Sequence, residues 1–174
     1  MTSAHIIRPP GIEPLDRHHD RAAFACGKPP LDAFLAKHAH QEMKRRVSVT
    51  YVLSGATLAE VAGYYTLAAT SVLLSDLPPA IARRLPRYPA VPATMLGRLA
   101  VASHYRGQRL GELLLLDALD RSLQYSEAIG STAVITDARD DESASFYRRY
   151  DFQPFAGAPR RLFIPMGTVA QLFR

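Results

Sequence analysis

Arginines and glycines in residues 95–111 are spaced as a phosphate-binding turn would require. A predicted strand over residues 95–101 leads into a short polar turn, and a long helix is predicted to start near Arg109. The first turn of a helix has N–H groups without intrahelical acceptors and carries positive potential. Gly107 and Gly111 lack a Cβ that would obstruct a ligand, and Arg106 adds a full charge. We therefore predict a pyrophosphate site at residues 106–111.

Two other glycine-containing phosphate motifs are absent from this sequence. No Gly-Lys-Ser/Thr run indicates a nucleotide triphosphate loop, and no Gly-x-Gly-x-x-Gly run indicates a dinucleotide fold. Taken alone, residues 106–111 are also compatible with an ordinary strand-to-helix turn that happens to be rich in glycine and arginine.

A second candidate is Tyr147, on a helix predicted over residues 142–150 after a strand over residues 131–137. A phenol with an ordinary pKa of about 10 stays protonated at neutral pH and can donate a proton to a leaving group. The alternative is that Phe146 and Tyr147 form a core-facing pair on an amphipathic helix.

The remaining nucleophiles and metal ligands form no convincing constellation. His38 and His40 are two residues apart and face different sides of a helix, and no cysteine cluster joins His18 and His19. Cys26 is the only cysteine, and we expect it to be a packed thiol in a turn. We predict no bound metal.

Basic residues gather in two stretches of a chain whose formal net charge is +5. This asymmetry favours a polyanionic partner or cofactor, although a solvated arginine-rich surface is the alternative. The candidate RNA-binding residues are Lys44, Arg45, Arg46, Arg83, Arg84, Arg87 and Arg98.

Length and composition bound the fold. The 174 residues suit one domain over 1–174, and 48% hydrophobic content indicates a folded globule. No apolar run approaches the ~20 residues of a membrane span, and no signal peptide is evident. The single cysteine excludes an internal disulfide. We therefore expect a cytoplasmic protein.

Strands and helices follow each other in an order that predicts an α/β (α+β) domain with a mixed sheet. Further elements are predicted at 31–46 (helix), 47–53 and 61–74 (strands), 76–85 and 110–128 (helices) and 161–166 (strand), with a proline-punctuated loop at 86–92.

Taken together, these motifs resemble the GNAT family of acyl-CoA N-acyltransferases. The family's pyrophosphate motif, Arg/Gln-x-x-Gly-x-Gly/Ala, matches Arg106 to Gly111, with Arg109 in place of the middle glycine. A second family signature matches residues 140–152 and places Tyr147 on the general-acid tyrosine; its usual glycine is Asp151, a change that we expect to matter little. The resemblance implies the GNAT fold, a twisted mixed sheet flanked by helices, and acetyl-CoA as co-substrate. The implied cofactor-binding residues are Leu99, Ala100 and Val101, whose backbone would pair with pantetheine, then Arg106, Gly107, Gln108, Arg109, Leu110 and Gly111, and Phe146.

The resemblance is greatest to one subgroup, the GNAT toxins of bacterial type II toxin–antitoxin pairs. It rests on residues 24–27, 31–35, 48–53, 63–67 and 85–89 as well as on the two motifs. It implies acetylation of the α-amino group of aminoacyl-tRNA, neutralisation by a ribbon-helix-helix antitoxin, and a homodimer. The alternatives are an acetyltransferase for a small amine or a protein N-terminus, and a non-catalytic acyl-CoA-binding module.

Overall fold

The computed structural model describes residues 11–174, which form two compact units joined by shared elements. One unit comprises Gly97–Ala118 and the described residues up to Ala68; the other comprises Ala69–Leu96 and Leu119–Arg174. The strands are β1 (Ile12–Pro14), β2 (Val49–Ser54), β3 (Val61–Leu73), β4 (Ala90–Val101), β5 (Ala133–Asp137), β6 (Gln153–Phe155) and β7 (Ala158–Pro165). The helices are α1 (Pro29–Ala33), α2 (Ala39–Lys44), α3 (Pro79–Ala82), α4 (Leu110–Ile129), α5 (Asp141–Arg148) and α6 (Met166–Leu172). A π-helical segment, Phe34–His38, makes α1 and α2 one continuous helical run.

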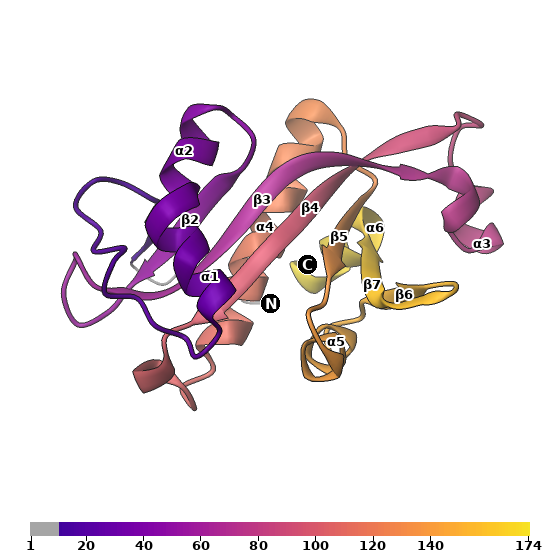
Figure 1. Cartoon of the computed structure of the whole chain (residues 1–174). Helices are drawn as coiled ribbons and strands as arrows, with labels where there is room; N and C mark the ends of the chain where they lie inside the picture. The colour runs from indigo at the N-terminus through magenta and orange to yellow at the C-terminus, as the bar shows by residue number, and fades with distance from the viewer. Residues whose placement is uncertain (1–10) are drawn as a thin grey trace. The chain divides into compact units, whose positions relative to one another are not determined.

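The strands form one seven-stranded sheet in the order β1-β2-β3-β4-β5-β7-β6 (Figure 1). β1–β2, β2–β3, β5–β7 and β6–β7 are antiparallel, and β4–β5 is parallel. This mixed sheet with flanking helices confirms the predicted fold class. Among residues 11–174, no helix is both long and apolar enough to cross a membrane.

In the first unit, side chains of β3 alternate between two helical layers. Tyr64 is fully buried, and its hydroxyl donates to the Leu31 carbonyl of α1 over 2.7 Å. Tyr65 points the other way, where its hydroxyl donates to Asp117 of α4 over 2.5 Å. At Gly63 an added Cβ would lie 2.7 Å from Leu114 of α4, so close helix packing requires glycine there. The period-two alternation therefore fixes α1 and α4 on opposite faces of this part of the sheet.

The second unit has its own apolar core, built where β4, β5 and β7 lie side by side. Thr94 of β4 is in register with Val134 of β5, and Ile135 with Phe163 of β7. The core cluster contains Val72, Leu77, Val91, Ala93, Ile135, Phe155 and Phe163. Burial of these side chains is the main stabilising contribution of this unit.

Several predicted boundaries were wrong for identifiable reasons. β4 starts at Ala90, so Pro92 lies inside a strand that was predicted to be a loop. Pro92 lacks only an N–H, and its carbonyl still accepts from Thr132 N and Oγ1, both over 2.8 Å. The short strands β1 and β6 and the helix α6 were not predicted, because three-residue strands carry little periodicity and α6 follows β7 without a linker.

Candidate active site

The predicted pyrophosphate turn lies in the first unit, between a short 3₁₀ turn at Ser103–Tyr105 and the start of α4. Gly107 has φ +82° and Arg109 has φ +58°, so two residues of the turn are in the left-handed region. A Cβ added at Gly107 would meet nothing within 4 Å, so the backbone there is open to a ligand. Such a turn at a helix N-terminus directs N–H groups outward, which suits a pyrophosphate.

The side chains of this turn are mostly exposed. Residues 106–109 are exposed, and Leu110 and Gly111 are half-buried. Arg106 donates from Nη2 to the Cys26 carbonyl over 2.5 Å, so this guanidinium also ties the turn to the loop before α1. Sequence reasoning missed this tether, because a backbone carbonyl acceptor leaves no signal in residue types.

β4 leads into this turn through the 3₁₀ segment Ser103–Tyr105. Ala100 is buried, whereas Leu99 and Val101 are half-buried. The next residue, Ala102, donates its N–H to the Ala62 carbonyl of β3 over 2.8 Å. The three residues expected to pair with pantetheine are therefore held at the C-terminal end of a strand that is anchored to its neighbour.

Tyr147 lies in the second unit, on α5, and is 7% exposed. The helix begins after an N-cap residue, Asp140, whose carboxylate accepts from Ser143 N over 2.8 Å. Burial raises the pKa of Tyr147 to about 12, and a side-chain hydrogen bond with Thr136 offsets part of that rise. A phenol with this pKa is fully protonated at neutral pH, as a proton donor must be.

Aromatic rings surround this tyrosine. The rings of Phe146 and Phe152 each have centroids 5.3 Å from that of Tyr147. Phe146 is itself half-buried, and its ring centroid lies 5.3 Å from that of Tyr150.

Asp151, which follows α5, has φ +68°, a conformation that explains why the family usually has glycine at this position. Aspartate tolerates the left-handed region better than most residues, in line with the small effect that we expect.

The predicted RNA-binding residues are mostly exposed, and the two units hold them separately. Lys44, Arg45 and Arg46 follow one another at the end of α2 in the first unit, and all three are exposed. Arg83, Arg84 and Arg87 are exposed in the second unit, just after the end of α3. Arg98 differs, because it is half-buried and its guanidinium lies 3.6 Å above the Phe34 ring.

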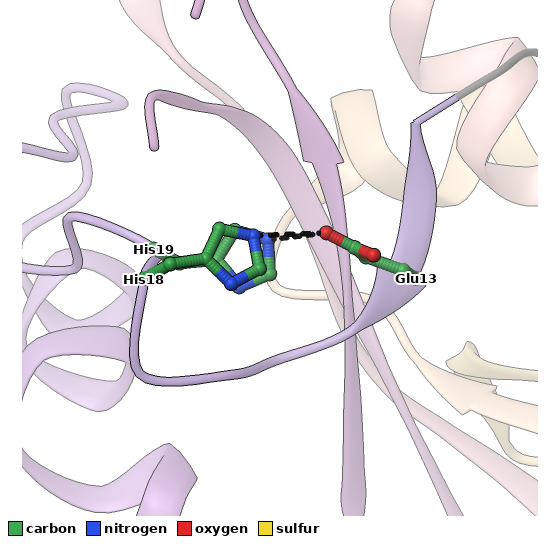
Figure 2. A group of neighbouring side chains, drawn as sticks. All are labelled: Glu13, His18 and His19. Carbon is green, nitrogen blue, oxygen red and sulfur yellow. Dashed lines mark hydrogen bonds and ion pairs between the residues drawn. The ribbon is translucent and has the colours of Figure 1, made fainter. Parts of the chain in front are cut away.

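Glu13, His18 and His19 form a cluster of possible metal ligands (Figure 2). The Nε2 atoms of both histidines lie 3.1 Å from Glu13 Oε1, and the centroids of the two rings are 4.0 Å apart with an interplanar angle of 38°. His19 Nδ1 accepts from Asp16 N over 2.9 Å, so Nε2 carries the proton of the neutral ring. A metal-bound histidine normally donates a proton from its other nitrogen. This pattern therefore favours a hydrogen-bonded structural cluster that fixes the turn after β1.

Cys26, the one cysteine, is buried as predicted. It is 4% exposed, and burial raises the pKa of its thiol. Its Sγ lies 3.7 Å from the Lys28 carbonyl, and its N–H donates to Asp32 over 2.9 Å. A buried thiol with a raised pKa is a poor nucleophile, which agrees with a packing role.

Comparison with known proteins gives matches over most of the chain. A family model of the acetyltransferase (GNAT) domain matches residues 79–154. The chain is 34% identical over 169 residues to the probable toxin TacT of Sinorhizobium fredii, covering 92% of this chain and 93% of that protein. It is 35% identical over 150 residues to a tRNA-acetylating toxin of Mycobacterium tuberculosis, covering 84% of this chain and 86% of that protein.

Solved structures give the same result. AtaT complexed with acetyl-methionyl-tRNAfMet has a TM-score of 0.86 and 29% identity, over 94% of this chain and 98% of that one. A tyrosine-to-phenylalanine variant of AtaT, bound to acetyl-CoA and the C-terminus of the antitoxin AtaR, has a TM-score of 0.79 and 27% identity, over 93% of this chain and 96% of that one. With a GNAT domain, toxin relatives above 30% identity and structural neighbours of the same kind, this chain belongs to the GNAT N-acetyltransferase toxins.

Proposed function

We propose that this protein is an acetyl-CoA-dependent toxin that acetylates the α-amino group of aminoacyl-tRNA and thereby blocks translation. The observation that carries the proposal is the 35% identity to a tRNA-acetylating toxin over 84% of this chain. Matches of this extent also support one GNAT domain over residues 1–174.

The turn at residues 106–111 would hold the pyrophosphate of acetyl-CoA. Its open backbone at Gly107 and its two left-handed residues suit an anion that approaches the main chain. Gln108, Leu110 and Gly111 would add N–H groups, whereas Leu99, Ala100 and Val101 would pair with the pantetheine amides. In the second unit, Phe146 is half-buried beside Tyr147, and the family resemblance makes it a further candidate for contact with acetyl-CoA.

The reaction joins the amine nitrogen to the carbonyl carbon of the thioester and breaks the carbon–sulfur bond. The α-amine of an aminoacyl ester has a lowered pKa and is substantially neutral near pH 7–8, so it can attack without a strong base. Tyr147 would give its proton to the departing sulfur, and the proton lost by the amine would restore the phenol through solvent. The products are the N-acetylated aminoacyl-tRNA and CoA, with no proton left over.

The arginines and lysine already named would contact tRNA phosphates, because guanidinium groups suit bidentate phosphate contacts. The AtaT structure with the C-terminus of its antitoxin supports a cognate antitoxin for this chain, and we expect one of the ribbon-helix-helix type. We also expect a homodimer, a cytoplasmic location where charged tRNA is available, and catalysis without a metal.

The decisive experiment incubates the protein with a charged tRNA pool and labelled acetyl-CoA, and then identifies the acetylated aminoacyl group. Tyr147→Phe removes one hydroxyl, so the rate should fall about 10²–10⁴-fold while acetyl-CoA affinity stays the same. If the variant keeps its rate within threefold, another group supplies the proton. If label enters free amines or protein N-termini but not tRNA, the acceptor is wrong and the acetyltransferase activity stands.

A further inference from the structure

Glu60 links the loop between β2 and β3 to the two residues that precede the pyrophosphate turn. His104 Nε2 lies 2.8 Å from Glu60 Oε1, and the Tyr105 hydroxyl donates to Glu60 Oε2 over 2.8 Å. The backbone N–H of Ala56 donates to both groups, with its nitrogen 2.9 Å from Glu60 Oε2 and 2.8 Å from the Tyr105 hydroxyl oxygen. Both carboxylate oxygens of Glu60 are therefore engaged, and both hold the 3₁₀ turn at Ser103–Tyr105.

The loop that carries Glu60 is itself closed by hydrogen bonds. Gly55 N–H donates to the Glu60 carbonyl over 2.8 Å, and Glu60 N–H donates to Thr57 Oγ1 over 3.2 Å. A Cβ added at Gly55 would lie 2.5 Å from the Tyr105 oxygen and 2.6 Å from Glu60 Oε2. The loop thus packs directly on these polar groups, and a side chain at residue 55 would displace them.

The charge states are consistent with a persistent link. Hydrogen bonds from His104, Tyr105 and Ala56 lower the pKa of the Glu60 carboxyl, so it is ionised at neutral pH. Donation to that carboxylate raises the pKa of Tyr105, so its hydroxyl keeps its proton. The hydrogen bonds around Glu60 are therefore charge-assisted over the whole physiological pH range.

The segment held in this way leads straight into the turn. Ser103 N–H is also tied down, by the Ala25 carbonyl over 2.8 Å. Residues 106–109 are exposed, and Gly107 and Arg109 have positive φ. The conformation of an exposed turn depends on how firmly its flanking residues are held. Here α4 holds one side, and the bonds to Glu60 hold the other.

We infer that Glu60 is a positioning residue for acetyl-CoA: by holding His104 and Tyr105 it fixes the entry of the turn at residues 106–111, so that the backbone amides meet the pyrophosphate already oriented. This inference rests on the proposed function. A preorganised site binds more tightly because it loses less conformational entropy when the ligand arrives.

The test compares Glu60→Gln and Tyr105→Phe with the native protein. Both variants should raise the Kd of acetyl-CoA in calorimetric titration, and its KM in the tRNA assay, about three- to tenfold. The kcat at saturating acetyl-CoA should stay within twofold, because no reacting group changes. The matched control is Glu13→Gln. Like Glu60→Gln, it removes a hydrogen-bonded carboxylate from the first unit, but the partners of Glu13 are His18 and His19, which lie outside the turn. Its acetyl-CoA affinity should equal that of the native protein.

Two results would overturn the inference. One is an unchanged acetyl-CoA Kd in both Glu60→Gln and Tyr105→Phe. The other is a loss of kcat and of thermal stability at constant KM, which indicates a purely structural role. If the native protein itself does not bind acetyl-CoA, the proposed function fails, and this outcome is distinct from either of the other two.

Discussion

Replacing Arg109 by glycine should stabilise this protein, although arginine-to-glycine changes usually destabilise. Arg109 has φ +58°, and its carbonyl accepts from Leu113 N over 3.2 Å, so it stands immediately before α4. The left-handed conformation costs a residue with a Cβ about 1–2 kcal/mol. Glycine removes that cost but adds about 0.5–1 kcal/mol of backbone entropy loss on folding. The net gain in free energy of unfolding should be about 0.5–1 kcal/mol.

For a chain of this size, a gain of that magnitude raises Tm by roughly 1–4 °C. The assay is thermal and urea unfolding without acetyl-CoA, because a ligand that binds only the folded state would add its own stabilisation. The matched control is Arg45→Gly, another exposed arginine beside a helix end, but with φ −87°. That variant relieves no strain and should lose about 0.5–1 kcal/mol. If Arg109→Gly loses as much as Arg45→Gly, the reasoning about strain in the turn is refuted.

Two further predictions concern tRNA and Tyr147. Replacing Arg83, Arg84 and Arg87 together by alanine should flatten the slope of log tRNA affinity against log salt by two or three units, at about 0.7–0.9 per lost phosphate contact. The affinity for acetyl-CoA should not change. A shallow slope that the triple change does not alter would exclude tRNA binding by these residues. The buried Tyr147 has its pKa raised from 10 to about 12, so the unfolded chain releases this proton first and stability must fall as pH rises above 10. Between pH 9 and 11 the native protein should lose about 1 kcal/mol more free energy of unfolding than Tyr147→Phe, as measured by urea titration. An equal loss would mean that the phenol is not buried in solution.

Sequence alone was sufficient for the properties that depend on residue type and local order. Residues 61–74 carry an apolar run typical of a buried strand, and the structure has β3 at Val61–Leu73. The helix predicted over 110–128 is α4, Leu110–Ile129, because a long amphipathic pattern is a strong local signal. The family resemblance likewise rests on motifs written in consecutive residues, and the match to toxin relatives confirms it.

Tertiary structure decided what depends on partners distant along the chain. Nothing in the spacing of Glu60, His104 and Tyr105 indicates that one carboxylate holds the other two side chains, since more than forty residues separate them. The same is true of Arg106, whose acceptor is a main-chain carbonyl at Cys26. The raised pKa of Tyr147 is also a tertiary property, because desolvation depends on what packs around α5 in the folded chain. Residue types thus indicated the candidate groups, whereas only the packed chain determined their orientation, their charge state and the contacts that hold them.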